Sequence, residues 1–307
     1  MTSFNPDRDI PDLSGKVILV TGGNNGLGKE TVLQLSKHNP AHIFLGARSE
    51  AKALEAIDEI RKAVPSAAKI TFLQLDLASF ESVKKAASSF LAQSSQLHLL
   101  INNAGIMATP PGTTTEGYEE QFGTNHMGHA LLTKLLLPAL KETAAATTPP
   151  QDVRVVTLSS LSEGWAPPAE TYSFDKLKTD FASISTTERY GISKIANVHY
   201  AAELARRHPE IRSVSVHPGL VNTGLMNGVT IARPYLKCIL PIVGLFVTQV
   251  ASGAKNQLWA ATSQDAKSGE FYHPVGVLGK GSKLSKDEKL AKELWEWTDE
   301  ELARYLL

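Results

Sequence analysis

The stretch Lys16-Val-Ile-Leu-Val-Thr-Gly-Gly-Asn-Asn-Gly-Leu-Gly28 is an apolar run that ends in a glycine-rich turn. Residues 16–21 are typical of a buried strand, and the helical pattern that follows covers residues 26–38. The lack of a Cβ lets the turn approach a pyrophosphate closely, and the helix N-terminus supplies free N–H groups. The order strand, turn, helix therefore predicts nucleotide binding at Gly22, Gly26 and Gly28, with a plain Gly/Asn turn as the alternative.

Strand and helix patterns alternate along the rest of the chain. We predict further strands at residues 41–47, 70–75, 97–101, 153–158 and 212–216. The intervening helices are predicted to end near residue 63 and to cover residues 80–92, 117–140 and 188–207. This alternation indicates an α/β protein with a doubly wound, mostly parallel Rossmann sheet and helices on both faces. We expect residues 1–307 to form a single domain.

Composition excludes several classes of protein. The 31 basic and 31 acidic side chains give no net charge, which argues against a nucleic-acid partner. Cys238 is the single cysteine, so no intrachain disulfide forms. The N-terminus lacks a signal-peptide pattern, and the apolar stretch at 239–247 contains Pro241 and Gly244 and is too short to span a membrane. We expect a cytoplasmic protein without a metal site.

The tip of the second predicted strand bears on the choice of dinucleotide. An acid at this position accepts hydrogen bonds from the adenosine ribose and repels a 2′-phosphate. The strand instead ends in Ala47-Arg48-Ser49, and an arginine offers a planar fork of donors to a phosphate. We therefore predict NADP(H) rather than NAD(H), with Ser49 and Lys52 as weaker contacts. A solvated surface arginine is the alternative.

Two Tyr-x-x-x-Lys pairs occur, Tyr172 with Lys176 and Tyr190 with Lys194. Protonation of a carbonyl oxygen by tyrosine requires that its pKa, about 10 in water, be lowered, and a lysine one helical turn away supplies positive charge. Tyr190 and Lys194 begin a long predicted helix that leads into the sixth strand. Tyr172 and Lys176 follow a segment rich in glycine and proline. We prefer the Tyr190 pair.

The chain resembles the classical short-chain dehydrogenase/reductase family, specifically from Lys16 to about Gly224 and more loosely to the end. Within it, the chain is most similar to the retinol dehydrogenase-like branch, and its C-terminal segment looks like that of fungal members. The family motifs are matched at Thr21–Gly28, Asp76–Leu77, Asn102–Gly105, Thr124–Gly128, Ser159–Ser160, Tyr190–Lys194 and Pro218–Thr223. The branch motifs are matched at Phe122–His129, Tyr190–Asn197, Gly269–Gly276 and Leu294–Trp297.

The resemblance implies catalytic roles. Tyr190 would be the general acid/base, and Lys194 would lower its pKa and hold the nicotinamide ribose. Ser160 would bind the substrate oxygen, with Ser159 and, less favoured, Ser162 as alternatives. Asn125 would hold a water that relays protons from Lys194, or would simply bridge helix and strand backbone.

The resemblance also implies a set of cofactor contacts, with Asp76 near the adenine and Thr223 near the carboxamide. Asp76 as a helix cap, Asn102 in a simple turn and Thr223 as a surface hydroxyl are the alternatives. The full set is Gly22, Asn24, Asn25, Gly26, Leu27, Gly28, Arg48, Lys52, Asp76, Leu77, Asn102, Ala104, Gly105, Tyr190, Lys194, Pro218, Gly219, Val221 and Thr223.

One departure concerns residues 161–189, a stretch longer than in the most compact family members. Tyr172 fits the compact spacing better than Tyr190, but the retinol dehydrogenase-like branch carries an insertion here, and we assign Tyr172 to it.

The apolar residues at 223–248 are predicted to form a lid over a lipophilic substrate, such as a polyketide, terpenoid, steroid or retinoid. An ordinary packed helix and a peripheral membrane contact are the alternatives. A C-terminal extension is expected at 275–307, and a homodimer through the helices of Asn125 and Tyr190 remains open. The predicted function is an oxidoreductase, with a catalytically silent NADP-binding or redox-sensing protein as the alternative.

Overall fold

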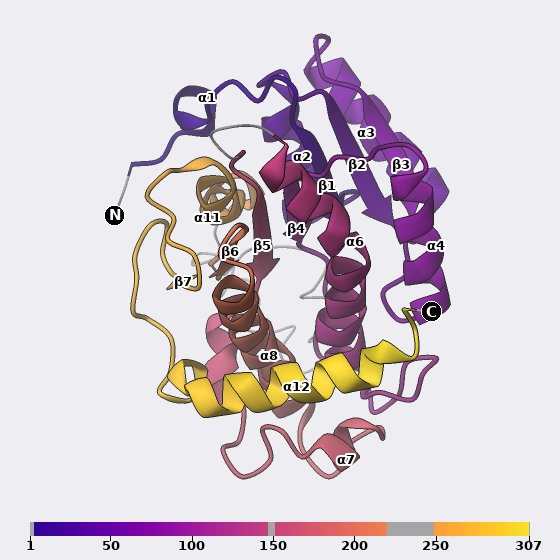
Figure 1. Cartoon of the computed structure of the whole chain (residues 1–307), viewed down its shortest axis with the longest axis vertical. Helices are drawn as coiled ribbons and strands as arrows, with labels where there is room; N and C mark the ends of the chain where they lie inside the picture. Colours follow the sequence, from indigo (N-terminus) through magenta and orange to yellow (C-terminus); the bar gives the residue numbers. More distant parts are fainter. Residues whose placement is uncertain (1–2, 147–150, 220–248, 307) are drawn as a thin grey trace, which may run out of the picture.

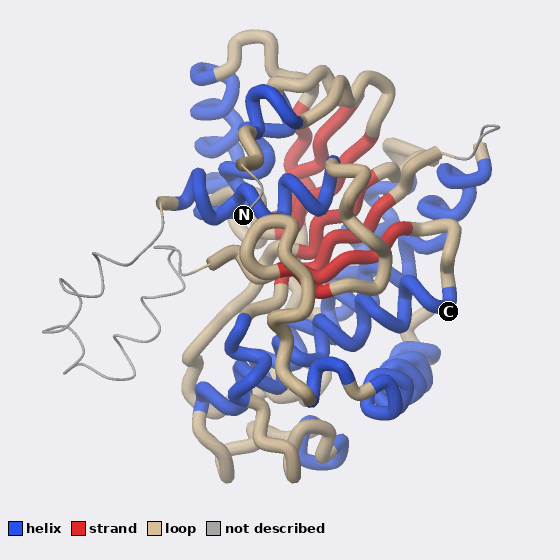
Figure 2. Tube along the Cα trace, turned by 90° about the vertical axis from the view of Figure 1, so that its left-hand side faces the viewer, coloured by secondary structure: helices blue, strands red, loops and turns tan. Residues whose placement is uncertain are grey.

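The computed structural model describes residues 3–146, 151–219 and 249–306. Its strands form one seven-stranded sheet in the order β3-β2-β1-β4-β5-β6-β7, and each neighbouring pair is parallel. Figure 2 shows this sheet between its helices. The doubly wound prediction is confirmed. The strands are β1 (Val17–Thr21), β2 (His42–Ala47), β3 (Ile70–Gln74), β4 (Leu99–Asn102), β5 (Arg154–Leu158), β6 (Arg212–Val216) and β7 (Phe271–Tyr272).

Alternate residues of each strand face opposite layers of helices. Leu19 of β1 packs with one layer, whereas its neighbours Ile18 and Val20 pack with the other. Figure 1 shows both layers around the sheet. The first layer contains α4 (Phe80–Leu91), α6 (Gly128–Ala145), α8 (Thr186–Arg207) and α12 (Glu288–Ala303), and the second contains α2 (Gly26–Ser36), α3 (Glu50–Ala63) and α11 (Val250–Thr262).

The long helix predicted within residues 117–140 begins at Glu120 and is interrupted. Gly117 has a φ of +87°, which ends the preceding turn in a conformation that glycine tolerates. The short helix α5 (Glu120–Phe122) then leads into a π-helical turn, η1 (Gly123–Met127), before α6. Such π-helical turns are frequent at functional sites, and this one carries Asn125. The other short helices within the described residues are α1 (Pro6–Asp9), η2 (Leu161–Trp165), α7 (Phe174–Leu177) and η4 (Leu284–Lys286).

The predicted C-terminal extension contains α12, which lies across α6 and α8 (Figure 1). Trp295 stacks on Tyr200 of α8 with ring centroids 4.8 Å apart, and Thr298 contacts His126 at 3.1 Å. Asp299 forms an ion pair with Lys134 of α6. The last helix of the chain therefore closes one face of the domain.

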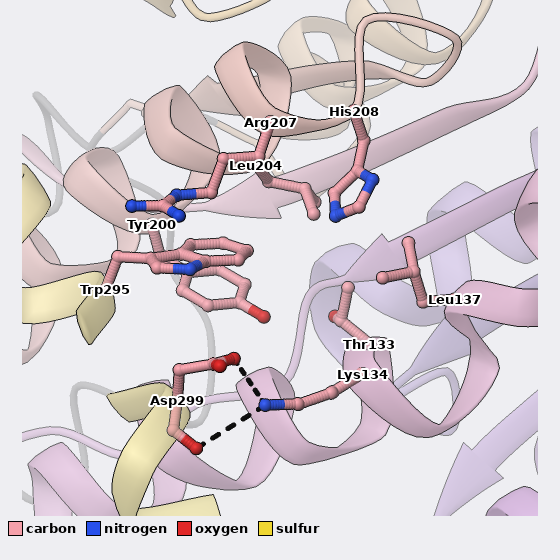
Figure 3. A pocket seen from close by; sticks show the side chains of 9 residues that line it. All are labelled: Thr133, Lys134, Leu137, Tyr200, Leu204, Arg207, His208, Trp295 and Asp299. Atoms are coloured by element: carbon pink, nitrogen blue, oxygen red, sulfur yellow. Dashed lines mark hydrogen bonds and ion pairs between the residues drawn. The ribbon is translucent and has the colours of Figure 1, made fainter. Parts of the chain in front are cut away.

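A pocket opens where α12 meets α6 and α8 (Figure 3). Its wall includes the Tyr200–Trp295 stack and the Lys134–Asp299 pair, and the Arg207 guanidinium lies 5.1 Å from the centroid of the Trp295 ring. The wall contains neither Tyr190 nor Lys194. We interpret this pocket as a hollow of helix packing, separate from the predicted catalytic site.

Within the described ranges, no helix has both the length and the apolar character that crossing a bilayer requires. The predicted lid at 223–248 lies outside the described residues, as do Val221 and Thr223.

Candidate active site

The glycine turn has the backbone that its sequence predicts. Gly22 and Gly26 have φ values of +66° and +50°, a region that favours glycine. A Cβ on Gly28 would lie 2.2 Å from the carbonyl oxygen of Gly22, so a larger residue cannot fit there. The first turn of α2 contains no acidic side chain that would neutralise its positive end. The residues present therefore fit a dinucleotide pyrophosphate.

Two neighbours of these glycines complete the turn. The Asn25 side chain accepts a hydrogen bond from Gly26 N–H at 2.7 Å and so caps α2. Asn24 is half-buried, and Leu27 is buried in the core between the sheet and the layer of α2, α3 and α11.

Asn103, which we did not assign a role, ties the glycine turn to the end of β4. Its Nδ2 donates to the carbonyl oxygen of Thr21 at 2.8 Å. Thr21 Oγ1 in turn accepts from Asn103 N–H and Ala104 N–H at 2.9 and 3.0 Å. The neighbouring Asn102 side chain points elsewhere and donates to Thr133 of α6 at 3.1 Å. The structure thus places Ala104, rather than the Asn102 side chain, beside the turn.

The residues predicted to contact the adenosine end lie at the tips of β2 and β3. Arg48 and Lys52 are both exposed, and Gln74 holds the Arg48 carbonyl through a 2.8 Å hydrogen bond. Asp76 Oδ1 accepts from Ala78 N–H at 3.0 Å, which makes Asp76 a local turn residue ahead of α4. Leu77 is buried, and its carbonyl lies where a Cβ on Gly128 would clash.

His129 connects the glycine turn to the helix that carries Asn125. Its ring nitrogens contact Thr21 Oγ1 and the Asn125 carbonyl oxygen, each at 2.9 Å. Burial lowers the pKa of His129 to about 4, so the ring is neutral near pH 7. A neutral imidazole both donates and accepts, which suits a link between a hydroxyl and a carbonyl.

Asn125 bridges the backbone after β4 to α8. Its Oδ1 accepts from Ile106 N–H at 2.8 Å, and its Nδ2 donates to the Ile106 carbonyl and to Ser193 Oγ, both at 2.9 Å. These contacts are of the kind expected from the alternative role of Asn125, a bridge between helix and strand backbone. A Cβ on Gly105 would lie 3.2 Å from Asn125 Oδ1 and 3.4 Å from Lys194 Nζ. Gly105 therefore leaves the space between these two polar groups open.

Ser160, Tyr190 and Lys194 meet at the end of β5. They are 8%, 6% and 4% exposed. Ser160 Oγ donates to Ser162 Oγ at 3.1 Å, and the Ser160 hydroxyl lies near enough to Tyr190 to oppose the rise of the tyrosine pKa. Lys194 Nζ donates to the Leu158 carbonyl at 3.1 Å and lies 5.6 Å from the centroid of the Tyr190 ring. Ser159 instead donates to the Lys194 carbonyl at 2.6 Å and anchors α8. Ser160 is thus the serine that faces the tyrosine.

Burial opposes the predicted lowering of the Tyr190 pKa by Lys194. It raises the pKa of Tyr190, and the Ser160 hydroxyl only partly opposes this effect. Burial also lowers the pKa of Lys194 to about 8, because the ammonium group is removed from water as well. Desolvation is therefore the largest cause of both shifts.

The competing pair, Tyr172 and Lys176, is not a pair in the structure. The Tyr172 hydroxyl contacts His199 Nδ1 at 2.7 Å, whereas Lys176 forms an ion pair with Glu170 at the surface. The stretch between Ser160 and Tyr190 contains η2 and α7, and Tyr172 lies in it just before α7. This arrangement agrees with our preference for Tyr190.

Pro218 and Gly219 follow β6 at the same edge of the sheet, and both are half-buried. Gly219 has a φ of +91°, which lets the chain turn sharply there. Across the described parts of the chain, no group of three or more His, Cys, Asp or Glu side chains is arranged to hold a metal ion.

Comparison with known proteins identifies the family. The profile of the short chain dehydrogenase family matches residues 16–165. A short-chain dehydrogenase/reductase of Armillaria gallica is 42% identical over 97% of this chain and 93% of its own length. Mouse retinol dehydrogenase 12 is 34% identical over 92% of this chain and 85% of its own length. The chain belongs to the short-chain dehydrogenase/reductase family of oxidoreductases, and it is a classical member of the fungal type.

Solved structures agree with this assignment. An uncharacterised protein from Mycobacterium paratuberculosis superposes with a TM-score of 0.74 at 29% identity and 97% coverage of both chains. An NADPH-bound carbonyl reductase from chicken fatty liver superposes with a TM-score of 0.63 at 24% identity, over 87% of this chain and 99% of that one. The second likeness shows the fold alone.

Proposed function

We propose that this protein is an NADP(H)-dependent oxidoreductase that interconverts an alcohol and a carbonyl on a lipophilic small molecule. The observation that carries the proposal is the meeting of Ser160, Tyr190 and Lys194 at the carboxyl end of β5. The glycine turn and the end of β4 lie at the same edge of the sheet, where a doubly wound fold places its ligands.

The chemistry divides between cofactor and chain. A bound nicotinamide would supply or accept the hydride. Ser160 would hold the carbonyl oxygen, and the Tyr190 hydroxyl would donate its proton to that oxygen during reduction or remove it during oxidation. Lys194 would favour the phenolate form by its charge, and its pKa of about 8 leaves that charge largely in place near pH 7.

The catalytic role of Tyr190 is tested by Tyr190→Phe, with Tyr172→Phe as the matched control. We expect Tyr190→Phe to bind NADPH normally and to lose turnover by a factor of about 10²–10⁴, the usual contribution of a positioned acid/base. Retained turnover in Tyr190→Phe together with its loss in Tyr172→Phe would sink the assignment. A wild-type protein that binds NADPH and reduces none of a broad panel of ketones would support the silent dinucleotide-binding protein instead.

The preference for NADP(H) rests on Arg48. Its side chain is exposed at the tip of β2, and its backbone is held by Gln74, so the guanidinium is free to meet a 2′-phosphate beside the turn. Lys52 is exposed one helical turn further on. We expect Arg48→Ala to weaken NADPH binding by about 10–100-fold, the usual value for a charge-assisted hydrogen bond. NADH binding serves as the internal control, and equal weakening of both cofactors contradicts the proposal.

The lipophilic substrate class has support within the described residues. Leu161 and Trp165 of η2 are 40% and 49% exposed, and η2 directly follows Ser160. The main chain of η2 also packs on Gly191, next to Tyr190, where a Cβ would lie 2.9 Å from the Ser162 carbonyl oxygen. Two exposed apolar side chains thus belong to the segment that follows Ser160 and packs on the start of α8.

Trp165→Ser tests this class. We expect it to raise KM for a bulky apolar ketone and to leave kcat/KM for a small ketone near wild type, because only the bulky substrate reaches the indole. The same change at Leu54, an exposed leucine of α3, is the control. A parallel loss for both substrates would argue against an apolar substrate contact at η2.

A further inference from the structure

Arg189 is a buried cation directly before Tyr190 in the first turn of α8. Its side chain is 2% exposed. Its Nε lies 3.3 Å from Glu119 Oε1, its Nη1 donates to the Asp180 carbonyl at 3.2 Å, and its Nη2 donates to the Thr109 carbonyl at 3.0 Å. One side chain therefore connects the turn that carries Tyr190 to three other segments.

Glu119, the partner of Arg189, is fully buried and fixed by its own contacts. Its Oε2 accepts from Phe122 N–H at 2.6 Å, and its backbone N–H donates to the Leu177 carbonyl at 2.8 Å. In the described part of the chain, Arg189 Nε and Glu119 Oε1 have no hydrogen-bond partner. These two atoms are thus satisfied only by the ion pair that they form with each other.

A second tie runs between the same segments. Gln121 Nε2 donates to the Thr186 carbonyl in the first turn of α8 at 3.0 Å, and its Oε1 accepts from Ala108 N–H at 2.9 Å. Ala108 and Thr109 belong to the loop that begins with Asn102–Gly105. The first turn of α8 is therefore bonded to the loop after β4 through Gln121 and Arg189. Arg189 also bonds it to Asp180, in the stretch between Ser160 and Tyr190.

A buried ion pair of this kind is a poor source of stability, because removing two charges from water costs about as much as their attraction returns. It does impose geometry, since a guanidinium fork satisfies several acceptors in one fixed orientation. The residue next in sequence is Tyr190, whose hydroxyl must meet Ser160. A small rotation of this turn would separate the two hydroxyls.

We propose that the Arg189–Glu119 ion pair is a positioning device that holds the Tyr190 hydroxyl against Ser160 and beside Lys194. This inference rests on the proposed acid/base function of Tyr190. Arg189 and Glu119 are positioning residues, because neither reaches the reacting atoms except through Tyr190.

The test compares Arg189→Lys with Arg206→Lys. Arg206 lies at the other end of α8, where its exposed side chain pairs with the buried Glu203, so the same change removes an exposed fork. We expect Arg189→Lys to lower kcat by about 10-fold or more, because small misplacements of a reacting group are costly, while KM and the Kd of NADPH stay near wild type. Arg206→Lys should change none of these values.

The pH profile distinguishes positioning from a general structural role. The nearby Ser160 hydroxyl opposes the rise of the Tyr190 pKa. Movement of Tyr190 away from Ser160 in Arg189→Lys should therefore shift the tyrosine limb of alcohol oxidation to higher pH, by up to about one unit. A variant that is merely less stable would keep this limb in place.

Glu119→Gln is the second variant, with Glu203→Gln as its control, and it decides the question if Arg189→Lys does not fold. It keeps the acceptor for Phe122 N–H but removes the charge that faces Arg189, so we expect the same changes in smaller measure. Unchanged kcat and an unshifted pH limb in the variants that fold would overturn the proposal, as would weakened NADPH binding with an unshifted limb. Turnover retained in Tyr190→Phe would instead overturn the proposed function itself.

Discussion

The two Tyr-x-x-x-Lys segments share a spacing but lie in different environments. Tyr190 and Lys194 occupy the second and third turns of a 22-residue helix, and both are buried where β5 ends. Tyr172 precedes the four-residue helix α7, and its lysine lies at the surface beside Glu170. The spacing brings the two side chains together only where a long helix continues through both of them. A Tyr-x-x-x-Lys spacing therefore forms a candidate catalytic site only where one long helix carries both residues, as α8 does.

The largest effect is expected on turnover when each of the two lysines is replaced in turn. We expect Lys194→Met to reduce turnover by about 100-fold or more, the lower end of what acid/base catalysis contributes, because the buried tyrosine loses its neighbouring charge. Lys176→Met removes only an exposed ion pair and should leave turnover unchanged. Steady-state kinetics with NADPH and an apolar ketone measure both, and equal losses would show that the two segments are not functionally distinct.

A smaller effect is expected on the free energy of unfolding. Here it is the Tyr172 segment, rather than the Tyr190 segment, in which the change matters. Tyr172→Phe leaves the buried His199 Nδ1 without the 2.7 Å contact to the Tyr172 hydroxyl. This change should lower the free energy of unfolding by about 1–3 kcal/mol, the usual cost of an unsatisfied buried polar group. Urea denaturation measures it. Tyr305→Phe, on a half-buried ring packed edge-on against Phe80, is the control, and a null result at Tyr172 would remove its structural role.

A pH dependence of stability is expected at the same contact. Burial lowers the pKa of His199 from 6.5 to about 4, so the unfolded chain binds this proton more readily than the folded chain. The stability that His199 contributes is complete above pH 6.5 and is lost as the pH falls toward 4.

His199→Gln removes this titration. We expect the free energy of unfolding of the variant to fall less steeply between pH 6.5 and 4, by up to about 1.4 kcal/mol per pH unit. The matched change at His208, just after α8, is the control. Parallel curves for the wild type and His199→Gln would show that the histidine is not the titrating group.

Local patterns made the fold and the centre of the site predictable. The glycine turn is a contiguous run whose backbone requirements are visible as glycines, and Gly22, Gly26 and Gly28 meet them. The six longer strands were found because each is an apolar run between turns. The two-residue β7 has too few residues to show a period, and the π-helical turn at Asn125 has no pattern that distinguishes it from an ordinary helix.

Contacts between distant segments were not predictable. Asn103 supports the glycine turn, His129 links Thr21 to Asn125, and Arg189 pairs with Glu119, in each case between residues from separate elements. The upward effect of burial on the Tyr190 pKa was likewise not predictable, because burial is a property of the folded chain. A spacing of four residues reveals that a lysine is near but not how much water surrounds it.

The position of α12 has a consequence for how the protein is made. Its residues leave the ribosome after the whole sheet, yet they cover aromatic rings of segments synthesised much earlier: Trp297 packs against Tyr118 and Phe122, and Trp295 stacks on Tyr200. The sheet can assemble during synthesis, since domains fold as their chain emerges, while this aromatic face waits for its cover. A nascent chain that stalls just before α12 therefore exposes an apolar surface. A variant truncated at Asp287 should bind a hydrophobic dye that the full chain excludes.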